Sequence, residues 1–213
     1  MKQTVGIVIA TFGDEEYWGK LADRAIASVE AQTVKPDKIV RIHGKTLHES
    51  RNDGVRQTDC DLIVVCDADD EIHEEYVAYM VQGDGDVRIP SVQLYYDMPP
   101  KSRVLPPFVI RPGVSLQNRN HVPIGAMFRR DAFDKVGGFK DWPIFEDWWL
   151  WCEMWLAGYQ NFQTIPEAIY KVRSRLGSRN SQVQYAAQMV REVRALFERS
   201  EQNENRKVLE AGR

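Results

Sequence analysis

An apolar run in the first third of the chain ends abruptly in acidic side chains. The run Leu62–Cys66 leads into Asp67, Asp69 and Asp70, so three carboxylates fall within four positions. Carboxylates this close repel one another unless a cation lies between them. Mg²⁺ and Mn²⁺ prefer hard oxygen ligands and often bind together with phosphate groups. The acidic cluster therefore indicates a site for a divalent cation and a diphosphate.

The same acidic residues allow a second interpretation. Acidic side chains stabilise the positive end of a helix dipole, and a helix is expected over residues 72–81. Asp70 and Glu71 fit this capping role, whereas Asp67 and Asp69 precede the cap and fit it less well. Both interpretations stay open on this segment alone.

The elements that must hold these side chains alternate between strand and helix in the N-terminal half. Strands are expected at 4–10, 38–42 and 62–66, and helices at 18–32, 49–57 and 72–81. This order predicts a parallel sheet with right-handed crossovers. Ligands bind beyond the carboxyl ends of the strands in such sheets, which is where the acidic cluster falls.

The second half of the chain is expected to be more varied. Its expected elements are β-like runs in 86–96 broken by Pro90, an irregular loop at 98–107, a strand at 124–129, a short helix at 131–136, an aromatic-rich helix at 146–156, a last strand at 168–172, an amphipathic helix at 181–199 and a frayed polar end at 201–213. We expect one domain over residues 1–180, followed by a C-terminal helix and polar tail over 181–213.

Composition excludes several classes of protein. The chain has 213 residues, of which 43% are hydrophobic and 28% are charged, and its net charge is -3. This balance gives no general attraction to nucleic acid or to an anionic membrane. No apolar stretch is long enough for a membrane span or a signal peptide. The odd, unpatterned cysteines Cys60, Cys66 and Cys152 predict a reduced, cytoplasmic protein.

Six segments, in this order along the chain, together resemble the motifs of glycosyltransferase family 2. They are Val5–Thr11 with Phe12, Ser50–Gly54, Leu62–Asp70, Gly125–Arg130, Val136–Phe139 and Glu146–Trp151. The resemblance covers about residues 4–173. It implies a GT-A fold, which is a mixed, mostly parallel central sheet flanked by helices, here with a C-terminal amphipathic helix. It also implies inverting transfer of a sugar from a nucleoside diphosphate to an acceptor hydroxyl.

The resemblance assigns the acidic residues to specific roles. Asp147 would be the general base that takes the acceptor proton, with Glu146 beside it. Asp69 would be the main ligand of Mn²⁺ or Mg²⁺, and Asp67 would contact the donor ribose or a metal-bound water. Ala68, between these two, falls in the donor site. For Glu146 and Asp147 the alternative is capping of the helix that they begin.

Donor binding by resemblance involves further residues. Thr11, Phe12 and Arg51 match positions near the nucleotide, although Arg51 can also be read as an exposed charge at a helix start. His43 stands where the family usually has an acid that contacts the base, so dTDP and GDP stay open beside UDP. Arg173 stands where the family often has a histidine. Arginine cannot ligate a metal, but it can pair with diphosphate oxygens, so weaker metal dependence is expected.

The sequence leaves several kinds of acceptor open. A saccharide, a protein side chain, a lipid-linked glycan and a modified nucleic acid are all compatible. Trp142 and Trp148 are candidates for the acceptor site because sugar faces stack on indole, although helical spacing favours the core for most of these tryptophans. The apolar stripe of the last helix allows packing on the domain or formation of a homodimer.

Two other classes of protein are weighed against the transferase. A nucleotidyltransferase acting on sugar phosphates would normally carry a Gly-rich, basic loop after the first strand, but residues 11–16 are acidic. A non-catalytic nucleotide-sugar-binding module would not need the acids at Asp67, Asp69 and Asp147. The sequence therefore favours the transferase.

Overall fold

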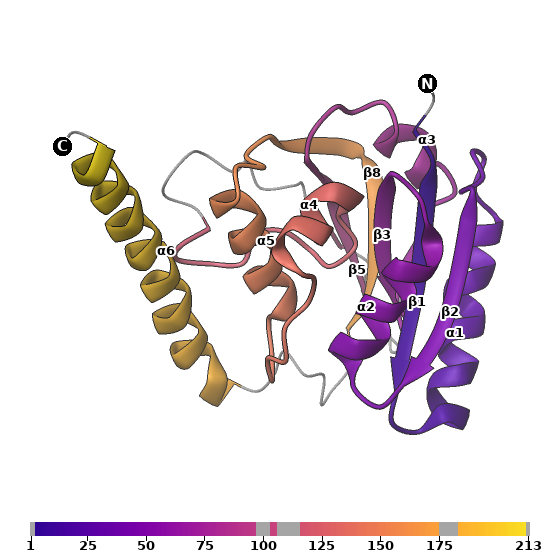
Figure 1. The fold of residues 1–213 in the computed structure, drawn as a ribbon. Coiled ribbons are helices and arrows are strands. Elements are labelled where there is room, and N and C mark those ends of the chain that lie inside the picture. The colour runs from indigo at the N-terminus through magenta and orange to yellow at the C-terminus, as the bar shows by residue number, and fades with distance from the viewer. Residues whose placement is uncertain (1–2, 97–102, 106–115, 175–182, 212–213) are drawn as a thin grey trace.

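The computed structural model describes residues 3–96, 103–105, 116–174 and 183–211. Eight strands in this part of the chain form one sheet in the order β2-β1-β3-β7-β5-β8-β4, and β6 pairs with β5 (Figure 1). The strands are β1 (Val5–Phe12), β2 (Lys38–Gly44), β3 (Leu62–Asp67), β4 (Glu71–Ile72), β5 (Val87–Tyr96), β6 (Arg103–Leu105), β7 (Met127–Arg129) and β8 (Phe162–Ser174).

The sheet is mixed and mostly parallel, as predicted. β2, β1 and β3 pair in parallel, and β5 and β8 pair in parallel. β7 lies antiparallel between β3 and β5, so those five strands share one direction. The short strands β4 and β6 run the opposite way. The carboxyl ends of β1 and β3 therefore lie next to each other at one edge of the sheet.

Helices cover the sheet, and the last two lie to one side of it. They are α1 (Glu15–Glu30), α2 (Leu47–Thr58), α3 (Tyr76–Met80), α4 (Arg130–Val136), α5 (Glu146–Leu156) and α6 (Val183–Ala211). Figure 1 shows α6 beside α5, at the far end of the molecule from α1. In the part of the chain that the structure describes, no helix combines the length and the apolar character needed to cross a bilayer.

The first β-α-β units pack tightly and fix the carboxyl ends of β1 and β3. The apolar side chains of β1 and β3 are almost entirely buried, as expected for strands covered on both faces. α2 packs closely on β1 because Gly54 has no side chain. A Cβ at Gly54 would lie 2.3 Å from Val8 Cγ1. The residues at the start of α2 are thereby brought to the end of β3.

Several expected elements differ in the structure. The helix expected over 72–81 is shorter in the structure, because Ile72 belongs to β4, which pairs with β8, and α3 covers only Tyr76–Met80. β5 continues through Pro90, and its register with β8 shifts between Pro90 and Ser91, an irregularity of the kind at which proline is tolerated in a sheet. Residues 103–105 of the expected loop form β6, and the rest of that loop lies outside the described residues.

Two differences concern the ends of elements. The strand expected at 124–129 is shorter, since β7 covers only Met127–Arg129. The polar end expected to fray is helical to Ala211, where the pair Arg206 and Glu210 adds i,i+4 support. The helices α4 and α5 agree closely with the sequence prediction.

Candidate active site

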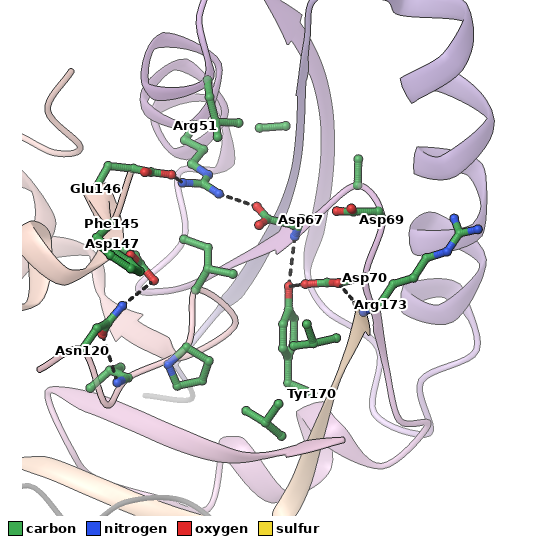
Figure 2. Close-up of a pocket in the computed structure, with 18 of the residues that line it drawn as sticks. Arg51, Asp67, Asp69, Asp70, Asn120, Phe145, Glu146, Asp147, Tyr170 and Arg173 are labelled. Atoms are coloured by element: carbon green, nitrogen blue, oxygen red, sulfur yellow. Dashed lines mark hydrogen bonds and ion pairs between the residues drawn. The ribbon is translucent and has the colours of Figure 1, made fainter. Parts of the chain in front are cut away.

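A cavity of about 680 Å³ opens at the carboxyl ends of β1 and β3. Residues from β1, α2, the loop after β3, β8, the segment before β7 and the start of α5 line it (Figure 2). The sequence-predicted residues at its wall are Thr11, Phe12, Arg51, Asp67, Ala68, Asp69, Glu146, Asp147 and Arg173. The fold thus brings nine of the twelve predicted site residues to one cavity.

Arg51 connects two acidic groups from distant parts of the chain. Its Nη1 donates to Glu146 and its Nη2 donates to Asp67. The Phe139 ring lies under the guanidinium, 5.4 Å from Cζ to the ring centroid. Arg51 is only 2% exposed, so its reading as an exposed helix-start charge is wrong.

Arg51 stays protonated although it is buried. Burial by itself lowers the pKa of the guanidinium, but Asp67 and Glu146 more than offset that effect and the net pKa is raised. Arg51 is therefore a permanent cation inside an acidic site. It fixes the carboxylate of Asp67 at the end of β3 and that of Glu146 at the start of α5.

Asp70 does not cap a helix. It is 6% exposed, its Oδ2 accepts from the Tyr170 hydroxyl at 2.8 Å, and its Oδ1 accepts from the Arg173 backbone N at 2.9 Å. The Tyr170 oxygen in turn accepts from the Asp67 backbone N at 3.1 Å. Burial, and then the nearby Asp67 and Asp69, raise the pKa of Asp70. Asp70 and Tyr170 thereby tie the acidic loop to β8.

Asp147 faces the cavity from the first turn of α5 and is partly buried. Its Oδ1 accepts from the Trp148 backbone N at 2.8 Å and its Oδ2 accepts from Asn120 Nδ2 at 3.1 Å. Burial and then Glu146 raise the pKa of Asp147 to about 7, against the lowering effects of Arg51 and the two hydrogen bonds. A carboxyl group with this pKa can accept a proton near neutral pH.

The residue before this pair takes a rare backbone conformation. Phe145, at the N-cap of α5, has φ 57° in the left-handed region, which is uncommon for a bulky side chain. Its ring also lines the cavity. The turn at Phe145 aims Glu146 and Asp147 toward the carboxyl end of β3, and such strain is commonly kept at functional sites.

One end of the cavity is aromatic. Phe12 stacks on Trp18 with ring centroids 6.5 Å apart and an interplanar angle of 18°. Thr11 Oγ1 lies 3.0 Å from His43 Nδ1 and also reaches the Ile42 carbonyl at 3.3 Å. His43 is exposed and does not itself line the cavity, so it reaches the site only through Thr11.

The two tryptophans predicted for the acceptor lie elsewhere. Trp148 is 2% exposed and its Nε1 donates to the Leu116 carbonyl at 2.7 Å, which is a core position. Trp142 packs on Trp149 with ring centroids 4.9 Å apart. Neither Trp142 nor Trp148 lines the cavity. The helical spacing that favoured the core describes Trp148 correctly.

Three residues at the cavity carry no sequence signal of their own. Asn120 contacts Asp147, Tyr170 contacts Asp70, and Trp18 extends the aromatic end. Of these three, only Tyr170 lies near a residue with a predicted role, since it is three positions before Arg173 in β8. The others become site residues through tertiary contacts that no local pattern encodes.

The charged side chains that line the cavity are mostly acidic and would attract a cation. Five carboxylates line it against two guanidiniums, those of Arg51 and Arg173. Within the described residues, no group of three His, Cys, Asp or Glu side chains could hold a metal ion by itself. A divalent ion would therefore fit only with one or two carboxylates and with oxygens from a bound diphosphate, a donor set that suits Mg²⁺ or Mn²⁺.

Comparisons with known proteins agree with this fold. The chain has the GT-A fold of a glycosyltransferase. More narrowly, it belongs to glycosyl transferase family 2, whose family model matches residues 22–137. The matched range includes Arg51 and the acids after β3 but not Asp147, so the role of Asp147 depends on the geometry. No curated protein matches the chain by sequence.

Solved structures of similar fold share little sequence with this chain. S. aureus TarS residues 1–349 in complex with UDP-GlcNAc has a TM-score of 0.63 at 13% identity, covering 84% of this chain and 61% of that chain. GalNAc-T7 with UDP, GalNAc and Mn²⁺ has a TM-score of 0.56 at 13% identity, covering 82% and 44%. This chain therefore spans less than two thirds of the length of these proteins.

Proposed function

We propose that this chain transfers a sugar from a UDP-sugar to an acceptor hydroxyl, with inversion at the anomeric carbon. The observation that carries the proposal is that Asp147, with a pKa of about 7, faces the same cavity as the acidic end of β3. A base and a diphosphate site in one cavity are what direct displacement requires. UDP is proposed because the two similar structures contain UDP-GlcNAc or UDP.

The two reacting ends of the site are separated in space. Asp147 and Asp69 lie on opposite sides of the cavity in Figure 2. In an inverting transfer, the acceptor oxygen attacks from the side opposite the departing diphosphate. Asp147 would take the proton of that hydroxyl as the new bond forms, in a transition state with oxocarbenium character. Glu146, paired with Arg51, would keep the start of α5 in position.

The diphosphate would be bound at the acidic loop. Asp69, with Asp67 beside it, would hold Mn²⁺ or Mg²⁺, which neutralises the charge that develops on the leaving diphosphate. Arg173 lines the same end of the cavity and can pair with phosphate oxygens. Thr11 and Phe12 would bind the nucleobase, with His43 orienting Thr11. The acceptor would enter beside Asn120, His121 and Phe145.

The substitution Asp147→Asn tests the base. We expect loss of at least about 100-fold in turnover of UDP-GlcNAc, with UDP binding unchanged, because the amide cannot take a proton and the donor contacts lie elsewhere. Asp141→Asn is the matched control, since Asp141 is exposed near the same helix and lies 3.3 Å from His48 Nδ1. Full turnover by the Asp147 variant would move the base role to Glu146.

Chelation tests the metal. Turnover of UDP-GlcNAc would be measured after EDTA treatment and again after addition of Mn²⁺ or Mg²⁺. We expect turnover to fall with EDTA and to recover with the ion, while Arg173 supports a residual rate. Unchanged turnover after thorough chelation would remove the metal from the proposal. Binding of UDP with no turnover of any UDP-sugar would instead favour a non-catalytic binding module.

A further inference from the structure

The side-chain amide of Asn120 lies between its own loop and the carboxylate of Asp147. Its Nδ2 donates to Asp147 Oδ2 at 3.1 Å, and its Oδ1 accepts from the Val122 backbone N at 3.2 Å. The Val122 contact decides which way the amide faces. With Oδ1 held by Val122, only the donor side of the amide can face Asp147 (Figure 2).

The second oxygen of Asp147 is fixed in a similar way. Oδ1 accepts from the Trp148 backbone N at 2.8 Å, so each carboxylate oxygen has one donor from the protein. Two donors on different oxygens fix the plane of the carboxylate, since rotation about its last bond would break both contacts. Each oxygen keeps a further lone pair, which can face a substrate in the cavity.

We propose that Asn120 is a positioning residue that orients the carboxylate of Asp147 and favours its ionised form. This inference rests on the proposed function, in which Asp147 is the base. An amide that donates to a carboxylate stabilises the charged form, because protonation of Asp147 would weaken that hydrogen bond. Asn120 would thus keep Asp147 able to accept a proton at a pH where burial and Glu146 oppose its ionisation.

Other titratable groups around Asp147 act in ways that can be separated from Asn120. Glu146 and Cys152 lie on the same helix, and burial raises the pKa of the Cys152 thiol, which stays neutral. Arg51 stays charged at all accessible pH values. His121 is on the loop of Asn120, and burial and then Arg119 lower its pKa.

The test is a direct titration of Asp147 by carbon NMR in protein with ¹³C-labelled aspartate carboxyl groups. The signal of Asp147 is the one missing from Asp147→Asn. We expect a midpoint near 7 in the wild type and a midpoint higher by about half a unit to one unit in Asn120→Ala. Asn118→Ala is the matched control. Asn118 is on the same loop and is exposed, and it bonds Arg194 at 2.8 Å instead of Asp147.

A second variant keeps the shape of the loop. Asn120→Asp retains an oxygen for Val122 but places a carboxylate against Asp147. The titration midpoint of Asp147 is therefore expected to rise further in this variant than in Asn120→Ala. With UDP-GlcNAc as the probe, the acid limb of kcat should shift by the same amount while KM stays unchanged. A midpoint that stays constant or falls in both Asn120 variants would overturn the inference.

The proposed function can fail separately. Full turnover by Asp147→Asn would remove Asp147 as the base, whatever the titration of the Asn120 variants shows. A loss of turnover in Asn120→Ala that is equal at every pH, with the wild-type midpoint, would mean that Asn120 only stabilises the loop and would also overturn the inference.

Discussion

The guanidinium of Arg51 holds two acidic ends of the cavity together. It contacts Asp67 at the end of β3 and Glu146 at the start of α5, and Glu146 lies 95 residues from Arg51 in the sequence. Removing one partner of a buried ion pair leaves charge without compensation inside the protein. Arg51 therefore contributes both to the stability of the fold and to the geometry of the site.

We expect Arg51→Leu to lower the free energy of unfolding by about 3–5 kcal/mol, because Asp67 and Glu146 lose their shared cation. Arg56→Leu on the same helix should change it by less than about 0.5 kcal/mol, since Arg56 pairs with Asp53 at the exposed surface. Urea denaturation of both variants measures the difference. Equal losses would mean that the buried pair contributes no more than the surface pair.

The raised pKa of Asp147 predicts a pH dependence of stability. The pKa is about 7 in the folded protein against a usual value of 3.8. Between these values the folded chain binds more protons than the unfolded one, so this group makes the protein less stable as pH rises from about 4 to about 7. Asp147→Asn should therefore be more stable than the wild type at pH 8, by about 1–2 kcal/mol.

Thermal unfolding at pH 5 and pH 8 checks this prediction. The gain in Asp147→Asn should shrink at pH 5, where the wild-type carboxyl is largely protonated. A gain that is the same at both pH values would come from packing and not from the buried charge. A loss of stability at pH 8 would contradict the assignment of Asp147 as a buried acid with a raised pKa.

Some residues of the site could be identified from the sequence and others could not. Asp67 and Asp69 could be selected because acids after an apolar strand are visible in the local pattern, and the resemblance to the family assigned roles to them and to Asp147. The burial of Arg51 and the contact of Asn120 with Asp147 could not, because both depend on segments that meet only in the folded chain. General rules place arginine and asparagine at the surface.

The acidic loop after β3 is connected to β8 through the Tyr170 hydroxyl and the Arg173 backbone N. The Tyr170 oxygen accepts from the Asp67 backbone N and donates to Asp70. β4 adds backbone pairing to the same strand, since Glu71 pairs with Lys171. The position of Asp69 at the cavity therefore depends on two elements that are about a hundred residues apart in the chain.

We expect Tyr170→Phe to cost about 1–3 kcal/mol in unfolding free energy, because the Asp67 N–H and an oxygen of Asp70 each lose a buried partner. It should also weaken binding of UDP with Mn²⁺, as the loop that carries Asp69 is loosened. Calorimetry measures the binding. Tyr79→Phe is the control, since its hydroxyl makes only a 3.4 Å contact with Glu75. Unchanged UDP affinity in Tyr170→Phe would separate the loop from donor binding.

Elements with strong local signals could be predicted, and elements made by long-range pairing could not. The bounds of α5 follow from acidic residues at its start and Gly158 after its end. β4 has only two residues, and its acidic flank has the pattern of a helix start. Pairing with β8 forms β4, and this pairing overrides the local preference for a helix.

The whole molecule is built outward from the sheet edge that carries the cavity. β1 and β3 are buried between helices, and α5 and α6 extend the core on the side away from α1 (Figure 1). α6 packs on α5 with Met189, Val193 and Phe197 buried. These residues serve the core of this chain. The homodimer expected as one use of the apolar stripe therefore stays a prediction, which light scattering in solution can check.

The two halves of α6 should contribute very differently to stability. Phe197 is 6% exposed and belongs to the core, whereas residues 201–207 are exposed. Phe197→Ala should lower the free energy of unfolding by about 3–5 kcal/mol, since it leaves a cavity beside α5. Ending the chain after Ser200 should change it by less than about 0.5 kcal/mol. Urea denaturation compares the two, and a large loss on truncation would mean that the polar half of α6 has a partner in this fold.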